Sequence, residues 1–139
     1  MEEFIKSIAK QYNLSVLSHQ SPKSGWEINL PARGNFICDL NIGPEALEFY
    51  VTIRLDTPNA EEVWSDWMDY YGYVKSDSKE KLINDKQIDL KYFIEQWMSS
   101  TGIRVSNQKK YFFNFKVAEW CHNDEWSELV ICDLSHNRY

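Results

Sequence analysis

The chain has 139 residues, of which 43% are hydrophobic and 26% are charged, and these proportions exclude a disordered segment and indicate a single domain over residues 1–139. Its 15 Lys and Arg residues against 21 Asp and Glu residues give a formal charge of −6, which argues against nucleic acids and anionic membranes as partners. The acidic first residues and the lack of a long apolar run predict a cytoplasmic protein.

Apolar residues at helical spacing predict a first helix over residues 2–13. Three stretches of alternating apolar and polar residues follow, at 26–30, 36–42 and 47–55, and the last alternates most regularly. Because only short turns separate them, we expect three strands of an antiparallel meander with one face in water.

Two further helices are expected in the middle of the chain. Asn59 and Glu62 have the spacing of a capping box, and the apolar residues that follow recur at helical spacing up to Gly72. The polar stretch 75–85 is expected to be a loop. A third helix is expected from about Asp89 to Gly102, where the glycine fits a helix end.

The C-terminal part returns to the pattern of strands. Residues 111–121 and 127–134 predict a hairpin closed by residues 122–125. The expected order is therefore α-β-β-β-α-α-β-β. We expect an α+β fold, with a single antiparallel sheet of about five strands and three helices on one of its faces.

The sharpest cluster of reactive side chains lies at residues 120–125. Cys121 and His122 are adjacent, so on a strand they point to opposite faces unless the turn begins between them, and their spacing is not that of a zinc site. The sequence has neither a phosphate-binding glycine loop nor the context of a catalytic triad. We expect no catalytic residue, metal or cofactor; a small hydrolase or transferase built on this pair is the enzymatic alternative.

Acidic and aromatic residues are concentrated together in two segments. Residues 56–72 and 119–133 each contain five acidic residues and no Lys or Arg. Exposed aromatic rings among carboxylates are typical of a binding surface for a basic protein. In the alternative interpretation, the aromatic residues form the buried side of the helix expected at 59–72. The residues predicted to contact a partner are Glu62, Asp66, Asp69, Tyr70, Asp124, Glu125 and Trp126.

In size, acidity, aromatic content and lack of catalytic motifs, the chain resembles the small immunity proteins that bacteria make against their own secreted nuclease toxins. The resemblance implies a non-enzymatic inhibitor of a basic toxin domain, because an acidic surface can occupy a basic cleft in place of phosphate. Two alternatives remain, a dimeric acidic chaperone of a secreted effector and a phage-encoded inhibitor of a host defence system. A monomer in solution would argue against the chaperone.

Overall fold

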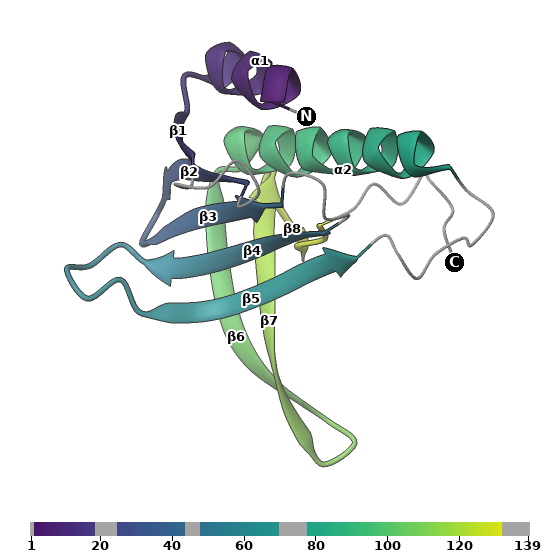
Figure 1. Cartoon of the computed structure of the whole chain (residues 1–139). Helices are drawn as coiled ribbons and strands as arrows, with labels where there is room; N and C mark the ends of the chain where they lie inside the picture. The colour runs from purple at the N-terminus through teal and green to yellow at the C-terminus, as the bar shows by residue number, and fades with distance from the viewer. Residues whose placement is uncertain (1, 19–24, 44–47, 70–77, 132–139) are drawn as a thin grey trace.

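The computed structural model describes residues 2–18, 25–43, 48–69 and 78–131. Within these residues the chain forms a five-stranded antiparallel sheet, a second sheet of three strands and two helices, so the α+β class is confirmed and the single sheet is wrong (Figure 1). The elements in chain order are α1 (Glu2–Tyr12), β1 (Ser15–Ser18), β2 (Trp26–Arg33), β3 (Phe36–Ile42), β4 (Glu48–Leu55), β5 (Glu62–Asp69), α2 (Lys79–Ser99), β6 (Gly102–Lys110), β7 (Phe113–His122) and β8 (Glu125–Glu128).

The first sheet is a meander in which each strand pairs with the next in the chain, in the order β1-β2-β3-β4-β5. The antiparallel pairing of β2, β3 and β4 confirms the strands expected at 26–55. Their apolar side chains alternate into the core, as in the cross-strand pair of Leu40 and Val51, which are both fully buried. The intervening residues point to the opposite face of this sheet.

The helix expected at 59–72 is wrong, because Glu62–Asp69 forms β5 along the edge of β4. The residues that follow the expected cap are rich in aromatic and β-branched side chains, which favour a strand beside an available partner. The stretch that has the spacing of a capping box forms the turn between β4 and β5 instead. In this turn Ala60 adopts a φ of 45° and donates its N–H to Thr57 O at 2.9 Å. Residues 70–72 of the expected helix lie outside the described residues.

Helix α2 begins well before the expected start at Asp89. The Ser78 side chain caps it by accepting the Lys81 N–H at 3.2 Å, and residues 79–85, expected in a loop, form its first turns. Leu82 and Ile83 are the apolar residues in these turns, and they pack against the core, so the helical period becomes clear only further along the helix. The expected loop residues 75–77 lie outside the described part of the chain.

The second sheet consists of a long hairpin, β6 and β7, with the short strand β8 beside β7. Strand β6 was not predicted from the sequence, because its outer half is polar. Residues 111 and 112 were predicted in a strand, but they form the turn. The expected C-terminal hairpin is present, but its turn contains only Asn123 and Asp124. Residues 132–134 of its predicted second strand are not among those described.

One hydrophobic cluster joins α2 to both sheets. Phe93 lies within ring-contact distance of Trp97 on the same helix and of Trp120 on β7, with ring centroids 6.4 and 5.6 Å apart. Trp97 is fully buried, and its Nε1 donates to Pro31 O at 2.8 Å. Arg33 donates to Trp97 O at 3.2 Å and to Met98 O at 2.8 Å, so one guanidinium holds the C-terminal end of α2 against β2.

Lys86 lies on the buried side of α2. Its Nζ donates to Gly43 O at 2.8 Å, which ties the helix to the end of β3. Burial disfavours the charged form and lowers the pKa of Lys86 to about 8, although the charge of Glu48 acts in the opposite direction.

This shift predicts a pH-dependent stability. Between about 8 and the ordinary value of 10.5, the unfolded chain holds a proton on Lys86 that the folded chain lacks, so the free energy of unfolding rises with pH. The rise is on the order of 3 kcal/mol across this interval. In urea titrations across the interval, Lys86→Met removes this rise and Lys91→Met, at an exposed site on the same helix, retains it. Parallel pH profiles for wild type and Lys86→Met would contradict the assignment.

Candidate binding surfaces

The outer face of β4 and β5 carries a pair of exposed aromatic rings. Tyr50 and Trp67 are cross-strand neighbours whose rings stack with centroids 5.9 Å apart and planes 18° apart, and they are 45% and 49% exposed. Glu62 and Asp66 are exposed on the same edge strand, although Asp66 follows the opposite pleat and accepts the Trp67 N–H at 2.8 Å. We call Tyr50, Glu62, Asp66 and Trp67 the acidic aromatic surface.

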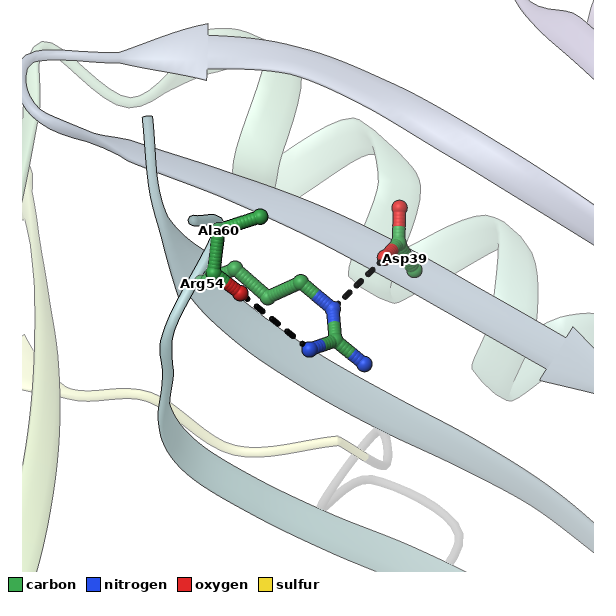
Figure 2. Close-up of polar contacts among 3 residues, drawn as sticks. All are labelled: Asp39, Arg54 and Ala60. Atoms are coloured by element: carbon green, nitrogen blue, oxygen red, sulfur yellow. Dashed lines mark hydrogen bonds and ion pairs between the residues drawn. The ribbon is translucent and has the colours of Figure 1, made fainter. Parts of the chain in front are cut away.

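The base opposite this surface on β4 is engaged elsewhere, and Lys116 of β7 lines a hollow together with Glu62. Arg54 lies opposite Glu62 in the strand register, yet its guanidinium binds Asp39 at 3.2 Å and Ala60 O at 3.3 Å (Figure 2). Within the described part of the chain, neither Glu62 nor Asp66 forms an ion pair with a lysine or arginine. The two carboxylates are therefore available to an external cation.

Two other predicted contact residues follow in the same segment. Asp69 ends β5, where its backbone pairs with Glu48, and Tyr70 lies outside the described residues. The interpretation in which the aromatic residues form a buried helix stripe is wrong for Trp67. Trp64, by contrast, is partly buried against the core, and Met68 is buried next to Phe49.

The second predicted surface lies at the turn between β7 and β8. Part of the acidic charge of residues 119–133 is neutralised there by a base from another strand. Asp124, Glu125 and Trp126 are all exposed there. However, Arg104 comes from β6 and lies over the Trp126 ring, 4.3 Å from its centre, while it donates to both Glu119 oxygens at 2.8 and 3.2 Å. The hydrogen bonds from Arg104 lower the pKa of Glu119. A base from a neighbouring strand thus covers the aromatic ring expected to meet a basic partner.

Cys121 and His122 do not converge. Consecutive residues of β7 point to opposite faces of the sheet, and His122 Nε2 lies 2.8 Å from Gln96 O at the end of α2. The imidazole also packs edge-on against Trp120, with centroids 5.6 Å apart. No hydrogen bond joins Cys121 to His122 in the described structure, so the two do not form a nucleophile with its base.

The most exposed apolar group of the described residues was not predicted, and it lies at the end of the β6–β7 hairpin. The hairpin projects past β5, away from both helices (Figure 1). We call residues 109–116 the aromatic hairpin tip. Residues 103–118, which contain it, have no acidic residue and four basic ones, Arg104, Lys109, Lys110 and Lys116. The exposed fractions of the aromatic side chains are 78% for Tyr111, 94% for Phe112, 67% for Phe113 and 49% for Phe115.

The turn at this tip is unfavourable for its residues. Tyr111 and Phe112 adopt φ values of 53° and 68°, a left-handed conformation that bulky side chains rarely tolerate. The turn between β7 and β8 has φ values of 52° and 65°, but there the residues are Asn123 and Asp124, which adopt this conformation more readily. Turn geometry therefore does not explain the aromatic residues at the tip.

Comparison with known proteins finds no matching family model, no matching curated protein and no matching solved structure. Among the residues described, no three His, Cys, Asp or Glu side chains are grouped so as to hold a metal ion. The helices in those ranges are too short or too polar to cross a lipid bilayer.

The contrast between the two turns predicts a stabilising substitution. Tyr111→Asn combined with Phe112→Gly raises the free energy of unfolding by about 2 kcal/mol, because it relieves two strained left-handed residues. The reciprocal pair Asn123→Tyr and Asp124→Phe lowers it by a similar amount. Urea unfolding of the purified proteins measures both changes. An unchanged or lower stability of the first variant would show that the aromatic turn is not strained.

Proposed function

We propose that the chain is a non-enzymatic inhibitor that binds a basic protein through the acidic aromatic surface. The observation that carries this proposal is the exposed stack of Tyr50 and Trp67, together with the exposed carboxylates of Glu62 and Asp66 along the edge strand β5, which form no ion pair among the described residues. Aromatic rings with a charged rim are the residues that dominate binding energy and speed association. The surface is built on two paired strands, so little conformational freedom is lost when a partner binds.

The expected partner is a toxin domain of the nuclease type. A nuclease needs a basic cleft for its phosphate backbone, and Glu62 and Asp66 would bind there in place of phosphates. This assignment agrees with the resemblance to bacterial immunity proteins, and it implies action in the cytoplasm without a cofactor. An inhibitor of a host defence nuclease carried by a phage would use the same surface; the genes beside the coding sequence separate these two sources.

The alternative function, a dimeric chaperone for a secreted effector, is supported by the aromatic hairpin tip. A chaperone needs exposed apolar surface to hold an unfolded segment, and the aromatic hairpin tip provides such a surface. The acidic aromatic surface would then be incidental. Inhibition of a folded, basic enzyme favours the first function, and binding that persists only with an unfolded effector segment favours the second.

Charge reversal tests which surface binds the basic partner. With a partner purified together with the chain from its native host, Glu62→Lys combined with Asp66→Lys slows association by roughly 10-fold or more at low salt, because both attractive charges become repulsive. Stopped-flow fluorescence measures the association rate. Added salt reduces the difference, since the charges are exposed.

The matched control reverses two acids on the other surface. Asp124→Lys combined with Glu125→Lys leaves the association rate near that of wild type. If this control slows association and the β5 variant does not, the interface lies at the β7–β8 turn. A partner with a net acidic cleft would refute the proposal as a whole.

A further inference from the structure

Strand β5 leaves one edge of the five-stranded sheet without a partner strand among the described residues (Figure 1). An unpaired edge presents a row of backbone N–H and C=O groups that can pair with another chain. The other edge strands in the described part of the structure are less suited to a basic partner, since β1 and β8 have four residues each and β6 has no acidic residue. Strand β5 has eight residues, and Glu62, Asp66 and Asp69 among them are acidic.

The hydrogen bonding of β5 shows which of its backbone groups point outward. Trp67 donates its N–H to Asp66 Oδ1 at 2.8 Å, so this N–H points away from β4. In an antiparallel ladder, the backbone groups of alternate residues point to the same edge. Ser65 lies two residues before Trp67, opposite Thr52 in unbroken register with β4. The N–H and C=O groups of Ser65 and Trp67 therefore point to the free edge, while those of Trp64 and Asp66 face β4.

A hollow of about 310 Å³ runs along the first half of this edge. It is lined by Glu62, Val63, Trp64 and Ser65 of β5 and by Lys116 of β7. Side chains of consecutive strand residues alternate between two faces, so four consecutive residues border one hollow only where it runs beside the backbone. Strand β7 thus approaches β5 at Lys116 without closing its edge.

We infer that the basic partner docks by adding an extended segment to the free edge of β5 as a further strand of the first sheet. This inference rests on the proposed function for the class of partner, and it adds how that partner is bound. Main-chain hydrogen bonds to Ser65 and Trp67 hold the segment along the edge. Its side chains alternate between the two faces, so one set meets Trp67 and its stack with Tyr50, and the other set meets Asp66.

Charge selects a basic segment as the occupant of this edge. Residues 56–72 contain five acidic residues and no Lys or Arg. A second copy of β5 paired edge to edge would bring the carboxylates of the two copies together, and like charges opposite each other destabilise a strand pair. A lysine or arginine of the partner placed opposite Asp66 forms an attractive cross-strand pair instead.

Asp66 links the strand addition to the charge of the partner. In the free protein its carboxylate accepts the outward N–H of Trp67. On docking, a carbonyl oxygen of the added strand accepts this N–H, and the carboxylate of Asp66 is released to the partner's cation. Both groups therefore keep a hydrogen-bond partner in the free and the bound state, which avoids the cost of an unsatisfied donor.

The test uses the full chain and the peptide acetyl-KTVKVKVTK-amide, in which lysine and valine alternate at the centre. Amide hydrogen exchange followed by NMR measures the protection of each N–H. With the peptide at millimolar concentration, exchange at Ser65 and Trp67 slows by roughly 10-fold or more, because these N–H groups become paired. Exchange at Trp64, which already faces β4, changes little. The acidic peptide acetyl-ETVEVEVTE-amide leaves these rates unchanged, because like charges repel it.

Two controls separate backbone pairing from attraction between side chains. The same basic peptide, N-methylated throughout its VKVKV centre, keeps every charge and side chain but has no central N–H to pair, and it gives no protection. Ser65→Pro removes an outward N–H, which an edge strand tolerates, and it abolishes the protection of Trp67, whereas Ser65→Ala retains it. The N-methylated peptide is tested on wild type, so its result does not depend on the folding of a variant.

The outcomes that overturn the inference are distinct. Absence of protection by the basic peptide, or equal protection by its N-methylated form, would exclude strand addition. Protection of Ser65 that rises with protein concentration in the absence of peptide would assign the edge to a second copy.

The inference and the proposed function fail in different ways. Inhibition of a basic partner whose binding leaves exchange at Ser65 unchanged would overturn the strand addition and leave the proposed function standing. Protection by the basic peptide, together with inhibition that is unaffected by Glu62→Lys and Asp66→Lys, would refute the proposed function and leave the edge site standing.

Discussion

The fold depends on how the end of α2 is held against β2. Trp97 fills the core at this point and donates its indole N–H to Pro31 O, while the Arg33 guanidinium binds the last carbonyl groups of the helix. Those carbonyls have no partner within the helix, and a cation at that end also complements the helix dipole. The contact fixes the long helix over one face of the meander and directs the chain into β6 at a defined position.

That placement determines which surfaces remain open. The five-stranded sheet buries its inner apolar residues in the cluster that includes α2 and the second sheet, while Tyr50 and Trp67 on its other face stay half exposed. A sheet with one wet face normally carries polar residues there. The aromatic pair on β4 and β5 departs from that pattern, and its two rings stack on each other across the strands.

The sequence predicted those parts of the fold in which a local pattern has only one interpretation. The alternation at 26–55 yielded β2, β3 and β4 because a period of two over many residues excludes a helix. At 62–69 the spacing of Val63, Trp64, Trp67 and Met68 fits a helix as well as a strand, and pairing with β4 decided the outcome. Of the acidic aromatic surface, sequence identified Glu62 and Asp66 but not the stack, which requires the register of two strands. Arg104 over Trp126 was likewise invisible, because its strand was missed.

The net charge of −6 is a sum over regions of opposite charge, and the fold places these regions on different elements. Residues 103–118, which have four basic residues and no acidic one, form most of one hairpin, while Glu62 and Asp66 lie on the edge strand of the other sheet. The average charge says nothing about a projecting hairpin of opposite sign.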